Sequence, residues 1–525
     1  MLKPLMSYRF GKKLMSSGAG ARFSRPMSAI FLAGLLSFAA ADSAQADTSP
    51  LWGKSGENWS PQGRLSDWSF AGYHSGEAPI PTPPVKASVK DFGARGDGIA
   101  DDTAAFKRAI EATNNGALLI PTGRYKLSDR LTINKSNLVL RGEGPQKSVL
   151  MFTKSLEELN PKSEVTMSGR PTSGYSWSGG LIWVEGKPLG IEVGKVKSIA
   201  RRGDYRIELD TPANVKVGQK IEIRQRDPGD KSLINYFFAG QTGDISKLTS
   251  VRIAFVSRVT GVNGSVLTLE RPLFNDFDPK WGASVWMFEP SVREVGLENL
   301  GFEFANRPYE GHFTEPGFNP FTFLGVADCW ARNLRIFNAD SGPFVRGNFV
   351  TVQNIVLDAN RAPDKLGNQG HHGITVGNDT LLRDFDYRIK FIHDISAEYS
   401  SGSVITQGKG VDLNFDNHKR VPFANLYTDV DTGLGTRMWA SSGGGGLGRH
   451  SASWSTWWNI RAAQPQVYPP EDFGPDTLNF VGLPSQQPST LNPQGRWFEP
   501  VAKQGLQPAN LYDAQLARRL AKTKK

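Results

Sequence analysis

A short motif recurs along this chain and constrains its fold more than any other feature. Each copy has an Asn, an aliphatic residue, any residue and usually another apolar residue. The copies begin at Asn137, Asn299, Asn333, Asn354, Asn425 and Asn459, with a variant at Asp394. From Asn299 on, successive copies are 34, 21, 40, 31 and 34 residues apart. Such spacing is typical of a β-solenoid, whose stacked coils bury alternating apolar residues. The Asn suits a turn, because it tolerates a left-handed backbone and can hydrogen-bond to its counterpart in the next coil.

The first 46 residues have the pattern of a secretory signal peptide. Basic residues up to Arg25 precede an apolar run from Met27 to Ala41, and Ala44-Gln45-Ala46 is a small-x-small cleavage site. The run is short for a membrane span, and no later stretch reaches span length. We therefore expect a secreted or periplasmic protein that begins near Asp47 and has no membrane span.

The net charge of +10 comes from the two ends of the chain. Residues 47–516 contain 50 basic and 50 acidic side chains, so global charge gives no reason to expect a nucleic-acid partner. The chain has one cysteine, Cys329, which excludes an intramolecular disulfide and a cysteine metal cluster. Its apolar neighbours predict a buried thiol.

Composition divides the chain into six segments. Between about 190 and 270, four stretches alternate cleanly between apolar and polar residues and are separated by Gly and Pro, which predicts a small antiparallel β domain. The predicted segments are 1–46 (signal peptide), 47–84 (a strap rich in aromatic residues and Pro), 85–155 (the start of the solenoid, with a helix), 156–290 (the inserted β domain), 291–465 (the main solenoid) and 466–525 (an irregular tail with a short helix).

The start of the solenoid carries a more specific pattern. The run 89–98 (VKDFGARGDG) leads to Asp101-Asp102-Thr103, a helix-like stretch, and then 120–125 (IPTGRY). This pattern resembles the opening of the pectate-lyase-like superfamily over about residues 88–152, and the Asn motifs extend the resemblance loosely to about 465. The resemblance implies an all-β, right-handed parallel β-helix whose opening helix caps the solenoid. It also implies a polysaccharide substrate. We expect a structural role for the paired aspartates.

Aligning the motifs on their Asn predicts a column of acidic residues. The fourth residue after the Asn is acidic in several copies, and neighbouring coils lie about 4.8 Å apart. The predicted carboxylate file comprises Asp358, Glu398 and Asp429, with Asp416 nearby. Such a file could bind Ca²⁺ or supply the acid and base of a hydrolase. A solvated face with scattered acids is the structural alternative.

The best candidate site is a band rich in histidine. Five of the seven histidines lie between 371 and 450, together with cations and aromatic residues. The catalytic candidates are His371, His372, His418, Lys419, Arg437 and Tyr399, and the substrate-binding candidates are His312, Glu315, Arg361, Trp439, Arg449 and His450. Histidines satisfied at turns are the structural alternative. Metal ligation by His371, His372, His393 and Asp416 stays open, although no compact ligand motif is present.

These residues favour a polysaccharide lyase that acts on a uronic-acid polymer. β-Elimination needs a base, a cation that neutralises the substrate carboxylate, and an acid for the leaving oxygen. His372 or His371 is the expected base, Arg437 and Lys419 the cations, and His418 or Tyr399 the acid. A glycoside hydrolase, a uronate epimerase and a non-catalytic carbohydrate-binding β-helix are the alternatives. The family's best-known lyases use Ca²⁺, so the resemblance leaves Ca²⁺ open as a cofactor. We expect a monomer or a small homo-oligomer.

Overall fold

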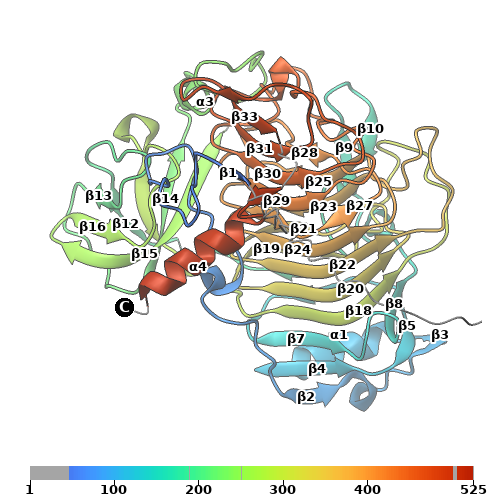
Figure 1. Cartoon of the computed structure of the whole chain (residues 1–525). Coiled ribbons are helices and arrows are strands. Elements are labelled where there is room, and N and C mark those ends of the chain that lie inside the picture. Colours follow the sequence, from blue (N-terminus) through green and yellow to red (C-terminus); the bar gives the residue numbers. More distant parts are fainter. Residues whose placement is uncertain (1–46, 189, 250, 501–504, 524–525) are drawn as a thin grey trace, which may run out of the picture. The chain divides into compact units, whose positions relative to one another are not determined.

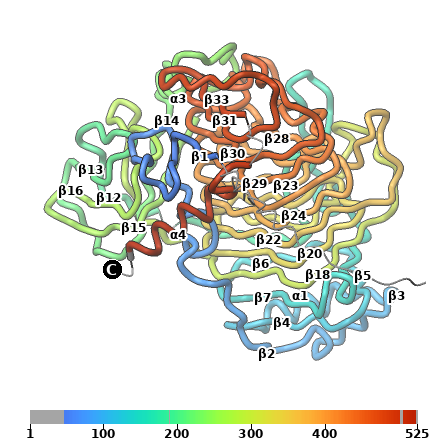
Figure 2. The backbone as a smooth tube through the Cα atoms, in the orientation of Figure 1, coloured from blue at the N-terminus to red at the C-terminus, as the bar shows by residue number. Residues whose placement is uncertain are grey.

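The computed structural model describes residues 47–188, 190–249, 251–500 and 505–523, whose regular secondary structure is mostly β-strand (Figures 1 and 2). The predicted signal peptide lies outside the described residues. The α-helices within these ranges are α1 (Thr103–Ala112), α2 (Leu156–Leu159), α3 (Ser232–Phe237) and α4 (Leu511–Thr523). None of them is long and apolar enough to cross a membrane. The prediction of an all-β chain is confirmed.

One parallel sheet, here called the long sheet, gains one strand with each coil of the solenoid (Figure 1). Its strands, in order of pairing, are β2 (Val85–Ser88), β4 (Gly116–Ile120), β7 (Leu138–Gly142), β18 (Gly296–Glu303), β20 (Trp330–Phe337), β22 (Thr351–Asp358), β24 (Leu381–Tyr387), β26 (Val404–Thr406), β29 (Leu426–Asp431), β30 (Thr456–Arg461), β31 (Asn479–Leu483) and β33 (Trp497–Pro500). A shorter stack of β3 (Asp97–Asp101), β5 (Gly123–Leu127) and β8 (Ser148–Phe152) also joins β18. Apolar side chains of successive coils form one continuous core.

A second parallel sheet, here called the site sheet, positions the candidate site. Its strands, in order of pairing, are β6 (Leu131–Ile133), β11 (Ile182–Glu185), β19 (Phe321–Ala327), β21 (Phe344–Asn348), β23 (His372–Val376), β25 (His393–Ala397) and β28 (Phe415–Asp416). The register places His372 beside His393 and Ser396 beside Asp416. Polar residues of three coils therefore lie side by side on this sheet.

Left-handed residues form a column across the long sheet, as the Asn motif predicts. The column, given by the strand register, contains Asn299, Asn333, Asn354, Asp384, Gln407, Asp429 and Asn459, all with positive φ. The Asn333 amide donates to Asn299 Oδ1 at 2.7 Å, and the Asn354 amide donates to Asn333 Oδ1 at 3.1 Å.

Three copies of the motif lie elsewhere. Asn137 belongs to a second column of left-handed residues, in register with Asn115 and Glu294. Asn425 lies four residues before the column position, which Asp429 occupies. Asp394 lies in β25 of the site sheet. The motif therefore marks coils correctly but does not give their common register.

Residues 192–287 form a separate antiparallel sheet with its own apolar core. Its strands are β12 (Glu192–Lys195), β17 (Ser284–Met287), β14 (Lys220–Arg226), β15 (Arg252–Asn263), β16 (Val266–Leu269) and β13 (Arg206–Glu208), in order of pairing. The segment proposed as an insertion, 156–290, also contains β11, which pairs within the site sheet, and a hairpin of β9 (Ser163–Val165) and β10 (Pro171–Ser173). Its first part thus belongs to the solenoid and its loops.

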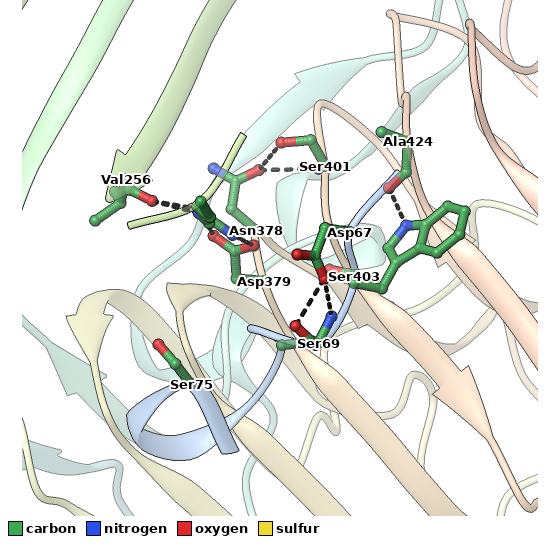
Figure 3. Close-up of polar contacts among 12 residues, drawn as sticks. Asp67, Ser69, Ser75, Val256, Asn378, Asp379, Ser401, Ser403 and Ala424 are labelled. Carbon is green, nitrogen blue, oxygen red and sulfur yellow. Dashed lines mark hydrogen bonds and ion pairs between the residues drawn. The ribbon is translucent and has the colours of Figure 1, made fainter. Parts of the chain in front are cut away.

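The strap and α4 pack together against one face of the long sheet. Trp52 and Trp68 join Leu426, Trp458 and Tyr512 in one buried apolar cluster. The Trp68 ring nitrogen donates to the Ala424 carbonyl at 2.6 Å (Figure 3). Strand β1 (Asp47–Thr48) pairs with β34 (Leu506–Gln507), so segments from both ends of the sequence meet here.

The paired aspartates at the start of the solenoid have structural contacts. Asp102 is buried and accepts hydrogen bonds from the backbone N–H groups of Arg95 and Gly96 at 2.6 and 2.9 Å. Asp101 accepts one from the Thr103 N–H at 3.0 Å. Phe106 and Ile110 of α1 are buried in the main core. The aspartates thus fix the loop that leads into α1.

Candidate active site

A groove of about 730 Å³ lies over the site sheet. Residues 164–168 of the β9–β10 hairpin form one wall, and Ser442, Gly443, Gly444 and Leu447 form another. Trp177, Phe313 and Phe344 contribute aromatic surface. His312, His371, His372 and His418 also line the groove. Four of the residues predicted as site candidates are thus histidines of one cavity.

Five histidines form one cluster at this groove. His371 directly precedes β23 and His372 begins it, and their ring centroids are 4.2 Å apart. His393 begins β25, one coil on, with its ring 4.9 Å from that of His372. The His312 ring, from the loop before β19, lies 4.4 Å from that of His371. The His418 ring, just after β28, lies 5.5 Å from that of His393.

The buried carboxylate of Asp416 connects two of the groove histidines. Asp416 Oδ2 accepts hydrogen bonds from His418 Nδ1 at 2.9 Å and from Ser396 Oγ at 3.0 Å. Its Oδ1 accepts one from the Ser442 N–H at 2.9 Å. Since Ser396 gives its hydrogen to the carboxylate, its oxygen accepts from His372 Nδ1, 3.0 Å away. This chain assigns the Nδ1–H tautomer to His372 and leaves its Nε2 without a proton.

The pKa values of these groups follow their surroundings. Burial, with the neighbouring histidines, holds the pKa of His372 well below its usual value. Burial also acts to lower the pKa of His418, but the Asp416 carboxylate outweighs it and leaves that pKa raised. Burial acts to raise the pKa of Asp416, yet His393 and His418 leave it well below its usual range. Burial lowers the pKa of His312 to about 4.

A second buried carboxylate lies behind His371. Glu315 Oε2 is 3.3 Å from His371 Nδ1, and the Tyr309 hydroxyl donates to Glu315 Oε1 at 2.6 Å. Burial acts to raise the pKa of Glu315, but His371 and the Tyr309 hydroxyl lower it to about 2. Glu315 was predicted to bind substrate, but it is buried and supports a histidine instead.

Two arginines lie close to Glu398 at the wall of the groove. Arg420 donates to Glu398 Oε1 at 2.9 Å, and Arg346 lies 3.6 Å from Oε2. The Tyr399 ring lies 5.9 Å from the Arg420 guanidinium. Tyr399, a predicted catalytic residue, therefore does line the groove, beside two arginines that were not predicted.

The other predicted cations and aromatic residues lie outside the groove lining. Arg437 pairs with buried Asp394 at 2.6 Å, and Arg361 with Asp340 at 2.9 Å. Trp439 packs on Trp457, Phe473 and Phe480. Arg449 donates to the Glu471 and Gly474 carbonyls, His450 lies 3.6 Å from Asp472, and the Lys419 stem packs against Gly443. In the structure these six residues contact neighbouring loops and coils outside the groove lining, so their predicted roles in substrate binding or turnover gain no support from it.

The predicted carboxylate file is not formed. Asp358 and Asp429 lie on the long sheet and pair with Arg335 and Arg461, whereas Glu398 follows β25 on the site sheet. Among the described residues, both groups of side chains close enough to share a metal ion contain histidine. Ca²⁺ needs several oxygen ligands in one place, and Asp358, Glu398 and Asp429, which lie on two sheets, do not form such a group.

Sequence reasoning missed several residues of the site. Ser396 becomes visible only once the register pairs it with Asp416. Arg346 and Trp177 come from other coils and carry no local motif. Arg420 directly follows the predicted His418 and Lys419, which was the one available signal.

Comparison with known proteins found a family match and relatives for part of the chain. Residues 87–187 match the family described as "Rhamnogalacturonase A/epimerase, pectate lyase-like". "Alginate lyase 7" of Azotobacter vinelandii is 29% identical over 155 residues, which are 27% of this chain and 17% of that protein. "Mannuronan C5-epimerase AlgE5" of the same organism is 33% identical over 100 residues, 17% of this chain and 10% of that protein. The chain thus spans less than a fifth of these relatives' lengths.

Solved structures of low sequence identity were also found. The tailspike gp49 of Pseudomonas phage LKA1 gives a TM-score of 0.39 at 13% identity, over 72% of this chain and 63% of that one. The exopolygalacturonase of Thermotoga maritima gives 0.31 at 14% identity, over 77% and 71%. Over residues 87–187 the chain is thus similar to a family described as pectate lyase-like, and its coils stack as parallel strands.

Proposed function

We propose that this chain cleaves a uronic-acid-containing polysaccharide by β-elimination in the groove. The observation that carries the proposal is that His372 and His418 both line the groove. His418 hydrogen-bonds directly to Asp416, and His372 is linked to Asp416 through Ser396. Their ring centroids are 6.1 Å apart. Elimination needs a base at the proton next to the carboxylate and an acid at the leaving oxygen, and two histidines at one site can supply both.

Each proton transfer of the proposed reaction is assigned to a residue of the groove. His372 Nε2 takes the proton on the carbon α to the substrate carboxylate, and the electron pair forms a carbon–carbon double bond. The glycosidic carbon–oxygen bond of the neighbouring carbon breaks, and His418 or Tyr399 protonates the leaving oxygen. Burial raises the pKa of Tyr399, so its hydroxyl stays protonated but is a weaker acid. Arg346 and Arg420 add positive charge at the wall, although both face Glu398.

Hydrolysis receives less support from the same groove. A glycoside hydrolase needs two carboxyl groups on either side of the scissile bond. Asp416 is fully buried and already accepts three hydrogen bonds. Of the carboxylates that line the groove, Glu398 pairs with Arg420, and Glu164 lies on the hairpin.

Epimerisation is the second candidate function. The sequence relatives include mannuronan C5-epimerases, and epimerisation begins with removal of the same proton. The proton then returns to the opposite face of that carbon, and the polymer stays intact. His372 and His418, on different coils, could serve as the two proton carriers.

An absorbance assay tests the proposal. The mature protein is incubated with pectic, alginate, glucuronan and glycosaminoglycan polymers, while ultraviolet absorbance of unsaturated uronate and new reducing ends are measured together. We expect both signals to rise on one polymer class. Reducing ends without absorbance would contradict elimination and indicate hydrolysis, and altered uronate stereochemistry without either signal would indicate epimerisation.

We also propose export to the periplasm or the medium, which the signal-like pattern before Asp47 supports. A mature N-terminus near Asp47 in the exported fraction is the expected result. Retention of full-length protein in the cytoplasm would contradict this proposal.

A further inference from the structure

We propose that His312, His371 and His393 bind one divalent transition metal ion of the zinc class beside the groove. One ring nitrogen of each lies within 4.8 Å of the others. His371 and His393 are only 1% and 4% exposed. Three imidazoles that converge in a mostly buried place form a donor set that zinc commonly uses.

A buried nitrogen without a hydrogen-bond partner is the second observation that points to a ligand here. His393 Nε2 is buried and has no hydrogen-bond partner, while its Nδ1 faces Asp416. A buried polar nitrogen without a partner is unfavourable, and native proteins rarely leave one in that state. A metal ion that accepts the lone pair of this nitrogen would satisfy it.

Carboxylates stand behind two of the three rings. His371 Nδ1 is 3.3 Å from Glu315 Oε2, and His393 Nδ1 is 3.6 Å from Asp416 Oδ2. A histidine that ligates a metal usually points its other ring nitrogen at a carboxylate or carbonyl, which fixes the tautomer and raises the basicity of the ligating nitrogen. The Tyr309 hydroxyl holds Glu315 in place at 2.6 Å. Two of the three histidines thus have a carboxylate near their Nδ1 atom, as histidine ligands of a metal usually do.

The donor atoms favour zinc over calcium, and one of the three rings can move to complete the site. Nitrogen donors suit Zn²⁺, Co²⁺ and Cu²⁺, whereas Ca²⁺ takes oxygen ligands. Tetrahedral zinc with bonds of about 2.1 Å requires donors roughly 3.4 Å apart, so the rings must draw closer on binding. His312 is the ligand that can move, because it is only partly buried and follows Gly311 in the loop between β18 and β19.

The site borders the groove and so connects to the substrate. His312 and His371 line the groove, so an ion among the three rings has an open side where an oxygen ligand can bind. A uronate carboxylate is such a ligand, and the ion would supply positive charge that the Glu398-paired arginines only partly provide. This last step rests on the proposed function, but metal binding itself does not.

An overlapping set of His393, Asp416 and His418 also lies within 4.8 Å. Asp416 already accepts hydrogen bonds from His418, Ser396 and the Ser442 N–H, so a metal there would have to displace donors. The three-histidine set requires no such loss. We therefore assign the ion to His312, His371 and His393.

Metal binding without substrate tests the assignment. The untagged mature protein is stripped with a chelator and titrated with Zn²⁺ by calorimetry, and with Co²⁺ by visible absorption. We expect one ion per chain, with no competition from Ca²⁺. His312→Gln and His393→Gln should each weaken binding at least about tenfold, and Glu315→Gln by roughly ten- to a hundredfold. His450→Gln, outside the cluster, and His418→Gln should keep it.

Two outcomes would overturn the assignment. Wild-type protein that is folded by circular dichroism but binds neither ion stoichiometrically contradicts the site. Binding that survives in both His312→Gln and His393→Gln, or that is lost in His418→Gln and kept in His312→Gln, places the ion elsewhere. His312→Gln guards against misfolding, because that residue lies on a loop. Since no substrate is present, failure here leaves the elimination assay unaffected.

Discussion

Arg271 and Asp379 form a buried ion pair between two parts of the chain. Arg271 Nη1 and Nη2 lie 2.7 and 2.8 Å from the two carboxylate oxygens, and Arg271 also donates to the Val256 carbonyl (Figure 3). Both side chains are less than 5% exposed. Arg271 follows β16 of the antiparallel sheet, whereas Asp379 precedes β24 of the solenoid. The pair therefore joins these two parts.

Removing one partner of this pair should be strongly destabilising. Asp379→Asn leaves the Arg271 charge buried without a counter-charge, so we expect the free energy of unfolding to fall by about 3–5 kcal/mol. Urea unfolding followed by tryptophan fluorescence measures the change. Glu208→Gln, at the exposed pair with Lys197, is the control and should change the free energy of unfolding far less than Asp379→Asn does. Equal shifts for both variants would contradict this account.

His74 gives part of the stability a pH dependence. Its Nε2 lies 2.6 Å from Glu294 Oε1, and this hydrogen bond raises the pKa of His74. Burial and Lys220 oppose the rise, while Asp328 adds to it. A histidine with a raised folded-state pKa stabilises fully below its unfolded pKa of about 6.5, and loses that effect as pH rises through the folded value.

We therefore expect His74→Gln to lower the thermal unfolding midpoint more at about pH 5.5 than at about pH 9. Melting curves of the two proteins at both pH values measure the difference. Glu294→Gln should reduce the same pH dependence, because it removes the charge that raises the pKa. A difference that grows toward high pH would contradict the assigned sign.

At the scale of elements, the groove depends on two segments that meet across it. A Cβ on Gly444 would lie 2.2 Å from Met167 Sδ at the tip of the β9–β10 hairpin, so an added methyl group must displace the Met167 side chain. Gly444→Ala should push Met167 away and disturb the wall, lowering kcat/KM roughly tenfold with little loss of stability. Gly445→Ala is a matched control, because nothing lies within 4 Å of its added Cβ. Equal kcat/KM for both variants would contradict this role.

The Asn column shows how far the sequence motif predicts the register of the coils. Asn299, Asn333 and Asn354 stack as predicted, but the next coils place Asp384, Gln407 and Asp429 at the same position. Several residue types tolerate a left-handed backbone there, so an Asn pattern cannot follow every coil. That loss of register produced the false carboxylate file, because it mixed residues of two sheets.

Part of the candidate site was also predictable from the sequence. The histidines are dense in the sequence, and His372 and His393 are spaced by one coil, so their proximity followed from the solenoid. The roles of Arg437 and Arg361 did not follow from the sequence. A cation near a site can equally pair with a buried carboxylate, as both do here. No local sequence pattern predicts which loop folds over which coil.

At the scale of the whole molecule, the antiparallel sheet helps to build the groove wall. The Lys247 N–H donates to the Gly446 carbonyl at 2.8 Å, and the Gly448 N–H to the Asp244 carbonyl at 2.7 Å. Leu447, which lines the groove, packs in the apolar core of residues 192–287. The solenoid thus supplies the histidines, and the segment between α3 and β15 holds a loop beside them.

The central claim is that His372 acts as the base of an elimination reaction. The most direct measurement compares the rate of absorbance increase for wild type, His372→Ala and His450→Ala on the polymer that responds, with polymer binding measured in parallel. We predict that His372→Ala lowers the rate about 10²–10⁴-fold, while binding and the His450→Ala rate stay near wild type. Unchanged turnover in folded His372→Ala would contradict the claim.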